Sequence, residues 1–206
     1  MANNPFSTLS NGLSPSGWNL EGFRARFYRQ FNAKQDAVEE ILRVAVRPDR
    51  SELTDVLVET ATEFAKTADE GTTLPSEVVE ILSSGYFVSS VDDEGFALQM
   101  LAWVTAREHD GIKEDMAALY ASLDERTEAG LEILLTAWGR TPVEPFTWVD
   151  IAKTLTAANE GFVLQHDVDS ERVAPELVSA VAIAILAGMT KHEAEKVEHV
   201  RDRFDL

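Results

Sequence analysis

The sequence contains no cysteine. That absence excludes disulfide bonds, a thiolate nucleophile and any metal site with cysteine ligands. The longest apolar run, Leu177 to Met189, is shorter than the roughly 18 consecutive apolar residues that cross a membrane. The first residues also lack the basic segment and following apolar segment that are typical of a signal peptide. We therefore expect a soluble, cytoplasmic protein that does not contact a membrane.

Positive charge is scarce. Eighteen basic residues stand against 36 acidic ones, which gives a formal net charge of −18 and argues against a general affinity for nucleic acid. The charge is distributed unevenly, because residues 1–50 hold seven basic and five acidic side chains, net +2, whereas the remaining residues hold 11 basic and 31 acidic ones, net −20. The little positive potential that exists therefore lies near the N-terminus.

Patterns that would carry catalysis or bind a metal are also few. The chain has four histidines and shows no Ser-His-Asp order, glycine-rich phosphate loop or Glu-x-x-His pair. His192, Glu195 and His199 would share one face of a helix, and such a stripe could bind zinc or nickel. Because they flank the apolar residues Val197 and Val200, we interpret them as a solvated flank. We predict no enzyme activity, no cofactor and no metal.

Apolar residues recur at helical spacing along most of the chain, and alternation with a period of two is nearly absent. The pattern predicts an all-α protein of about eight or nine helices. The first 18 residues, rich in Asn, Ser, Gly and Pro, predict an arm or loop. The predicted helices cover residues 19–31, 32–46, 51–68, 76–83, 96–108, 113–138, 147–165 and 175–189, with a last helix that ends near residue 204. Residues 86–91 are ambiguous: we favour a loop and the start of a helix, and a short extended run is the alternative.

The segment "RFYRQFNAKQDAVEEIL" combines arginines and aromatic residues at a predicted helix–helix junction. Tyr28 lies near the end of one predicted helix and Lys34 near the start of the next, and both can donate hydrogen bonds to phosphate. The alternative interpretation is an amphipathic helix pair with solvated arginines. The junction predicts a small N-terminal helical head, residues 1–47, followed by a larger helical domain, residues 48–206.

The same junction resembles the DNA-binding signature of TetR-family transcriptional regulators, in which an aromatic-Tyr-x-x-Phe pattern precedes a lysine that opens the next helix. Phe27, Tyr28 and Phe31 fill that pattern. The resemblance implies that Tyr28 and Lys34 contact the DNA backbone, while the two phenylalanines pack the head. The residues predicted to contact a DNA operator are Arg24, Arg26, Tyr28, Arg29 and Lys34.

The head departs from the family in one respect. Only 26 residues precede Phe27, and the first 18 are unsuited to a helix, so the family's first helix is missing and its second is missing or broken. Those helices brace the recognition helix against the DNA backbone. Three explanations stay open: a degenerate head, a true start further upstream, or support from a partner.

Residues Trp148 to Met189 are similar to the end of the TetR ligand-binding domain, in which two apolar helices are joined by an Asp-containing loop. Independently of that resemblance, Leu177 to Met189 is apolar on every face, which predicts a central helix or a subunit interface. We predict a homodimer in which these two helices pair with their two-fold mates; a plain core helix is the alternative. The predicted interface residues are Leu155, Phe162, Leu177, Val181, Ala184, Ile185 and Gly188.

A ligand pocket is expected among the middle helices, where large apolar side chains gather, although such side chains are also typical of a plain core. The predicted lining residues are Phe96, Met100, Trp103, Met116, Tyr120 and Trp138. Because few basic residues lie in this region, we expect a small neutral or cationic lipophile. The chain is thus predicted to be a TetR-like ligand-responsive regulator that binds DNA as a homodimer. The alternative is a dimeric helical small-molecule-binding module that has lost sequence-specific DNA binding.

Overall fold

The computed structural model describes residues 34–46, 52–67 and 74–203. The predicted N-terminal arm and the predicted helix at residues 19–31 lie outside these ranges. The chain divides into two compact units, Met1–Ile41 and Leu42–Leu206. The division falls inside helix α3 (Lys34–Ala45), ahead of the boundary predicted at residue 47. The description that follows concerns the second unit.

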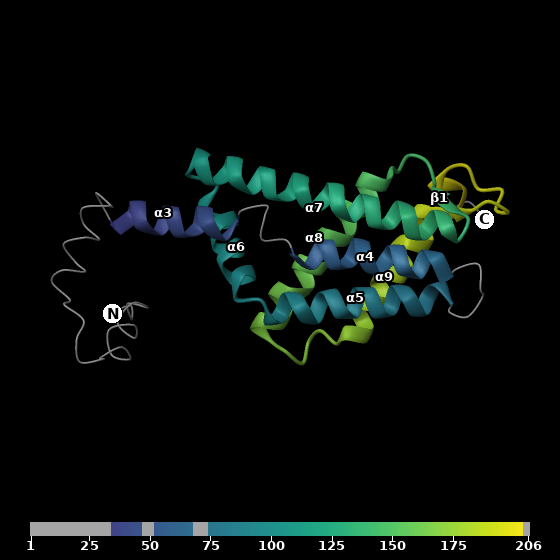
Figure 1. Cartoon of the computed structure of the whole chain (residues 1–206), viewed down its shortest axis with the longest axis horizontal. Coiled ribbons are helices and arrows are strands. Elements are labelled where there is room, and N and C mark those ends of the chain that lie inside the picture. The colour runs from purple at the N-terminus through teal and green to yellow at the C-terminus, as the bar shows by residue number, and fades with distance from the viewer. Residues whose placement is uncertain (1–33, 47–51, 68–73, 204–206) are drawn as a thin grey trace. The chain divides into compact units, whose positions relative to one another are not determined.

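The described ranges contain seven α-helices, one short 3-10 helix and a two-stranded sheet, which confirms the predicted all-α fold (Figure 1). After α3 come α4 (Glu52–Thr67), α5 (Pro75–Asp92), α6 (Glu94–Thr105), α7 (Asp110–Ala137), α8 (Trp148–Val168) and α9 (Pro175–Met189). Helix α4 packs on α7, α5 packs on α9, and α8 contacts α5, α7 and α9. None of the helices in these ranges has the length and apolar character that crossing a membrane requires.

Local polar contacts set several helix ends. Thr147 caps α8, because its Oγ1 accepts a hydrogen bond from the Asp150 N–H at 3.2 Å while the Asp150 carboxylate accepts one from the Thr147 N–H at 2.9 Å. Asp93 caps α6 by accepting from the Gly95 N–H at 2.8 Å. Helix α7 is followed by Gly139, whose φ of 64° is a conformation that glycine adopts at little cost. These helix ends are therefore encoded by short stretches of sequence.

Three clusters of buried apolar side chains, all made of described residues, contribute to the core of the second unit. The first joins α5, α7, α8 and α9 through Val79, Leu131, Leu135, Ile151, Ala152, Ala182 and Leu186. The second contains Phe87, Phe96, Val163, Val173 and Val178. The third contains Ala61, Val78 and Leu134. Because each cluster draws on at least three elements, burial of apolar area fixes how the helices pack.

The loop predicted at residues 86–91 was wrong, since α5 continues through this segment to Asp92. Serine is an unfavourable helix residue mainly because its hydroxyl competes for backbone hydrogen bonds. Here the hydroxyls of Ser83, Ser84 and Ser90 donate to the carbonyl oxygens four residues earlier in the same helix, at 2.6, 2.6 and 2.8 Å. Burial of the Phe87 side chain also stabilises the helix here, and the helix propensities of the residues do not include this contribution.

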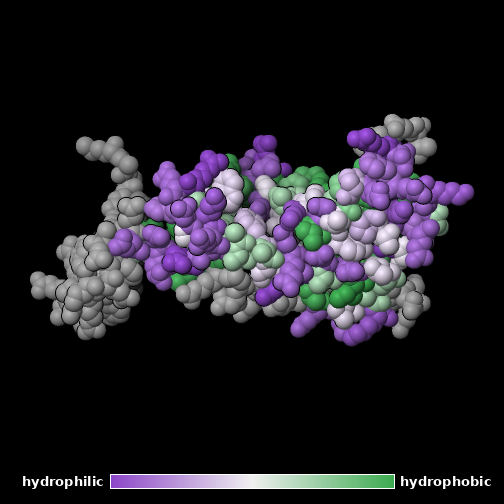
Figure 2. All heavy atoms as spheres, turned by 90° about the horizontal axis from the view of Figure 1, so that it is seen from above, coloured by the Kyte–Doolittle hydropathy of each residue, from purple (hydrophilic) through white to green (hydrophobic). Residues whose placement is uncertain are grey.

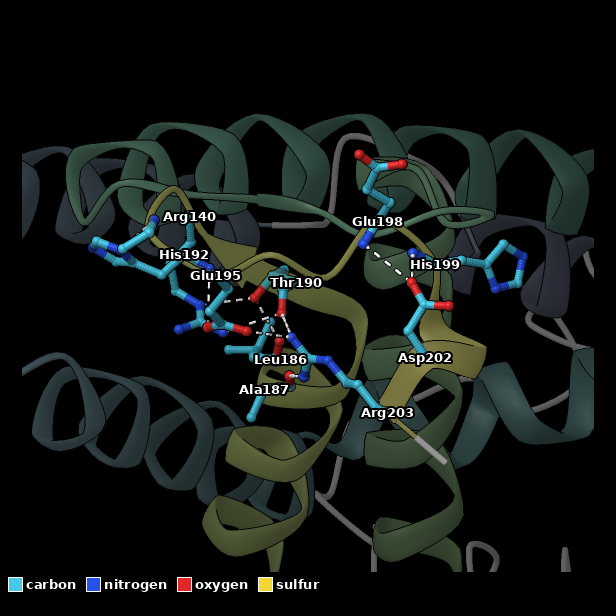
Figure 3. Close-up of polar contacts among 11 residues, drawn as sticks. Arg140, Leu186, Ala187, Thr190, His192, Glu195, Glu198, His199, Asp202 and Arg203 are labelled. Atoms are coloured by element: carbon cyan, nitrogen blue, oxygen red, sulfur yellow. Dashed lines mark hydrogen bonds and ion pairs between the residues drawn. The ribbon is translucent and has the colours of Figure 1, made fainter. Parts of the chain in front are cut away.

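The last predicted helix was also wrong. After α9 the chain forms β2 (Thr190–His192), which pairs antiparallel with β1 (Arg140–Pro142). Between β2 and residue 203, where the described range ends, the one further helix is the short 3-10 helix η4 (Val200–Arg203). Thr190 is fully buried, and its carbonyl oxygen accepts hydrogen bonds from the guanidinium groups of Arg140 at 3.1 Å and Arg203 at 2.8 Å (Figure 3). These tertiary contacts hold the segment in an extended conformation.

Hydrophilic side chains cover most of the face shown in Figure 2, with smaller hydrophobic areas between them.

An ion pair connects the last turn of α3 to α7, because Arg43 Nε lies 2.6 Å from Asp115 Oδ2. Leu42, on the last turn of α3, and Val46, which directly follows the helix, are buried. The end of α3 is therefore held both by apolar packing and by a charged contact.

Candidate ligand pocket

A pocket of about 110 Å³ lies among α5, α7, α8 and α9. Its lining residues are Val79, Leu82, Ser83, Tyr86, Thr127, Leu155, Thr156, Ala158, Asn159, Phe162, Val178, Val181, Ala182, Ile185 and Leu186. Most of these side chains are apolar, and none carries a formal charge at neutral pH. A mainly apolar concave site with a few placed polar groups is the usual form of a small-molecule site.

Asn159 is the most deeply buried polar residue of the pocket wall, at 8% exposure. Its Nδ2 donates to Ser90 Oγ at 3.2 Å, and Ser90 Oγ donates in turn to the carbonyl oxygen of Tyr86 at 2.8 Å. Among the described residues, its Oδ1 has no hydrogen-bond partner although it is buried. A buried acceptor without a donor costs free energy, so this amide oxygen lowers the stability of the folded chain.

A carboxylate lies next to Asn159 on α8. Glu160 Oε1 accepts hydrogen bonds from Tyr120 Oη at 2.9 Å and from Gln99 Nε2 at 3.1 Å. Burial raises the pKa of Glu160, the Tyr120 hydrogen bond lowers it, and the nearby Asp124 carboxylate raises it, with a net rise. Ionisation of the Glu160 side chain in the folded protein therefore costs free energy. Its two hydrogen bonds link α8 to α6 and α7.

The two tyrosines near Glu160 remain protonated over the whole physiological range. Burial raises the pKa of Tyr86 to about 12, and the charges of Glu160 and Asp93 add to the rise. Burial and the same Glu160 carboxylate raise the pKa of Tyr120 well above its ordinary value. Both hydroxyl groups therefore stay neutral, and that of Tyr120 donates its proton to the Glu160 carboxylate.

Replacing Glu160 with glutamine is expected to raise the free energy of unfolding at pH 7, because glutamine avoids a negative charge that burial disfavours. A carboxyl whose pKa is raised on folding binds its proton more tightly in the folded state. Folding stability therefore falls as the pH rises from the unfolded pKa, near 4.5, through the folded value. The gain should disappear below pH 4.5, where the wild-type side chain is neutral too.

Urea denaturation at several pH values measures this effect, and Glu132→Gln on the exposed face of α7 provides the control for loss of one charge. The control variant should not show the same dependence on pH. A lower stability of Glu160→Gln at pH 7 would contradict the prediction, because it would mean that the charged form is favoured by its hydrogen bonds.

The six residues predicted to line a ligand pocket do not line this one. They are Phe96, Met100, Trp103, Met116, Tyr120 and Trp138. Phe96 and Met116 are buried core residues, Met100 packs on the Phe87 cluster, and Trp138 packs where two core clusters meet. Tyr120 bonds to Glu160, and Trp103 is 49% exposed with the Arg107 guanidinium 5.5 Å from its ring centre. Large side chains fill space, so they mark the core rather than the cavity.

The residues predicted for a dimer interface fall into two groups. Leu155, Phe162, Val181 and Ile185 line the pocket. Leu177, Ala184 and Gly188 do not line it, and Leu177 and Ala184 are exposed. Of the predicted DNA contacts, Lys34 is the first residue of α3. The other predicted contacts, Arg24, Arg26, Tyr28 and Arg29, lie outside the described residues.

The histidine stripe does not form, because its residues are not on a helix. Figure 3 shows the imidazole rings of His192 and His199 pointing away from each other. Each accepts a hydrogen bond at Nδ1 from a nearby backbone N–H, at 3.2 and 3.1 Å, and the Glu195 carboxylate pairs with Arg203 at 2.9 Å. Within the described ranges, no three His, Asp or Glu side chains are grouped so as to hold a metal ion.

Sequence reasoning missed Tyr86, Asn159 and Glu160. One signal was available for Asn159: it shares the helix face of Ala152, Leu155 and Val163, a row that is otherwise apolar. A polar residue in such a row is either paired or functional. No comparable signal existed for Tyr86, because its segment was predicted to be a loop.

Comparison of the chain with protein-family models, with curated proteins and with solved structures finds no match. Its function must therefore be inferred from its own residues and their geometry.

Proposed function

We propose that this chain is a TetR-like, ligand-responsive transcriptional regulator that binds DNA as a homodimer and binds a small lipophilic ligand in its helical domain. The observation that carries the ligand-binding part is the mainly apolar pocket among α5, α7, α8 and α9. The DNA-binding part rests on the resemblance of residues Phe27 to Lys34 to the TetR signature. Ligand binding between α8 and α9 would bias the packing of the helices that we also propose as the dimer interface.

The homodimer is supported by exposed apolar residues on both C-terminal helices. On α9 the exposed side chains at helical spacing are Leu177, Ala180, Ala184 and Ala187. On α8 they are Ala157, Leu164 and Val168. Apart from its neighbours and backbone in the same helix, a Cβ added at Gly161 or Gly188 would meet nothing within 4 Å, so there is room for a partner to approach closely. Four such helices, two from each subunit, would form a compact interface.

The second candidate is a dimeric ligand-binding module without sequence-specific DNA binding. Its support is electrostatic: a chain of net charge −18 repels a polyanion, and only residues 1–50 carry a small positive excess. Both candidates need the pocket and the dimer. They differ only in whether residues 24–34 contact DNA.

Selection of the full chain against random DNA duplexes at low salt separates the two candidates. A working head should enrich a preferred site, and binding to it should weaken steeply with salt because each neutralised phosphate releases counterions. Lys34→Ala should then weaken binding to all sequences alike and flatten the log–log salt slope by about 0.9. Lys113→Ala, on the exposed face of α7, removes the same charge elsewhere and should leave the slope nearly unchanged.

If no site is enriched, and Lys34→Ala alters neither residual binding nor its salt slope, the binding-module candidate replaces the regulator. If a site is enriched but binding does not respond to any ligand of the pocket, the regulator lacks the ligand response proposed for it.

A further inference from the structure

We propose that the pocket among α5, α7, α8 and α9 binds an uncharged, hydrocarbon-like molecule about the size of one six-membered ring, and holds it by apolar contact rather than by a hydrogen bond. This inference rests on the proposed function, because it specifies the class of ligand for the same pocket. Three features of the pocket carry it: the apolar side chains of the wall, the absence of charge among them, and the size of the space.

Apolar side chains make up most of the wall. Ten of the fifteen lining residues are apolar, and they come from α5, α8 and α9. A ligand that enters this space therefore exchanges contact with water mainly for contact with hydrocarbon. Removal of apolar surface from water is favourable and needs no particular orientation of the ligand, so a hydrocarbon gains the most from this wall.

The polar side chains of the wall offer a ligand little directional bonding. The hydroxyl group of Ser83 donates its single proton to the carbonyl oxygen of Val79 at 2.6 Å. The Asn159 amide donates from Nδ2 to Ser90 Oγ at 3.2 Å, and its Oδ1 is buried, so that atom does not border the space. The remaining polar residues of the wall are Tyr86, Thr127 and Thr156. Their hydroxyl groups are neutral, and a neutral hydrogen bond contributes little net affinity once water has been displaced from both partners.

The charge of the ligand follows from the wall and from one group behind it. None of the described residues that line the pocket carries a formal charge, so a buried ion would lose its hydration without gaining a direct counter-ion. The Glu160 carboxylate does not line the pocket, and its Oε1 already accepts hydrogen bonds from Tyr120 at 2.9 Å and Gln99 at 3.1 Å. Its negative charge also disfavours an anion nearby. An uncharged ligand avoids both costs.

The size of the ligand follows from the volume of the pocket, about 110 Å³. An apolar protein cavity of about 150 Å³ is known to hold benzene, so this space suits one ring or a short branched chain. It is much smaller than the roughly 300–1,000 Å³ of sites for drug-sized ligands. The side chains that leave the space open are small ones, among them Ser83, Ala158 and Ala182.

The test compares four probes that each contain one aromatic ring: toluene, phenol, benzylammonium and benzoate. Titration calorimetry on the full chain at pH 7 gives their affinities. Toluene should bind at least about 5-fold more tightly than phenol, because burial of a hydroxyl group without a partner costs affinity. Benzylammonium and benzoate should each bind at least about 10-fold more weakly than toluene, because each would have to lose the hydration of its charge.

A pair of variants tests whether toluene binds in this pocket. Ala158→Phe fills the space and should weaken toluene at least about 10-fold. Ala129→Phe is the matched control, because Ala129 is exposed on α7 and does not line the pocket, and it should change the affinity by less than about 2-fold. If circular dichroism shows that Ala158→Phe does not fold, the smaller change Ala158→Val should fold and should still weaken toluene by about 3-fold.

The outcomes separate this inference from the proposed function. If Ala158→Phe weakens the probes but phenol binds as tightly as toluene or more tightly, the pocket is a ligand site in which a hydrogen bond contributes, and only this inference is overturned. The same holds if benzylammonium or benzoate binds as tightly as toluene. Binding of toluene that Ala158→Phe leaves unchanged would place the probe elsewhere and would also overturn the inference. If none of the probes binds the wild-type chain at millimolar concentration, both the inference and the ligand-binding part of the proposed function fail.

Discussion

Replacing Phe87 with alanine is expected to lower the free energy of unfolding by about 3–5 kcal/mol. The side chain is only 2% exposed and belongs to the cluster that contains Phe96, Val163 and Val178. Its ring also meets the His166 ring edge-on, with 5.6 Å between the ring centres. Alanine would remove most of the apolar area that connects α5 with α6, α8 and α9, and it would leave a cavity that a close-packed core closes only in part.

Val88→Ala is the matched control, because the neighbouring residue on α5 is 46% exposed. Its effect should stay within about 0.5 kcal/mol, as for most surface substitutions. Urea denaturation followed by circular dichroism measures both variants. If Phe87→Ala leaves too little folded protein to measure, Phe87→Leu should still fold with a loss of about 1–2 kcal/mol. Equal losses at the two positions would show that α5 does not present Phe87 to the core.

Replacing Ala184 with glutamate is expected to dissociate the proposed homodimer while the subunit stays folded. Ala184 is exposed on α9, so within one chain the new carboxylate would remain in water. In a dimer built on α8 and α9 it would instead be buried against the partner without a counter-ion. The resulting penalty of at least about 3 kcal/mol corresponds to a loss of affinity of roughly 100-fold or more.

Light scattering at micromolar concentration gives the result directly, and circular dichroism shows whether the fold is kept. The wild type should have the mass of a dimer and the variant that of a monomer. Ala118→Glu places the same charge on the exposed face of α7 and should leave the dimer intact. A monomeric wild type, or a variant that stays dimeric, would refute an interface that contains Ala184.

Sequence patterns predicted the fold best where the determinants of structure are local. Helix α8 begins at a Thr147 cap with its Asp150 partner, and α9 begins at Pro175, so a few adjacent residues determine where each helix begins. The prediction failed where contacts between residues far apart in the chain determine the local conformation. The segment after Met189 is extended because Arg140 and Arg203 bind Thr190, and Arg140 lies 50 residues away in the chain. No local pattern contains that information.

The position of the pocket also could not be predicted from local sequence patterns. Large apolar residues such as Phe96 and Met116 were predicted to line it, yet they are buried core residues that fill the space around them. A cavity arises where facing side chains are too small to fill the gap, as Ala158 and Ala182 are. Which small residues face each other depends on the angles between packed helices, and these angles are not encoded in any single helix. Only the polar residue Asn159 in an apolar row marked the site in the sequence.

The pairing of β1 with β2 has a consequence for the order in which the domain folds. The two strands close a chain segment of about 50 residues, and closing a flexible loop of that length costs about 3.5 kcal/mol of chain entropy. The cost falls once α8 and α9 have formed and packed, because the helices bring the strands together. The sheet and its two arginine contacts should therefore form after the transition state for folding. Contacts that form so late slow unfolding more than they speed folding, so this small sheet should lengthen the time for which the domain stays folded.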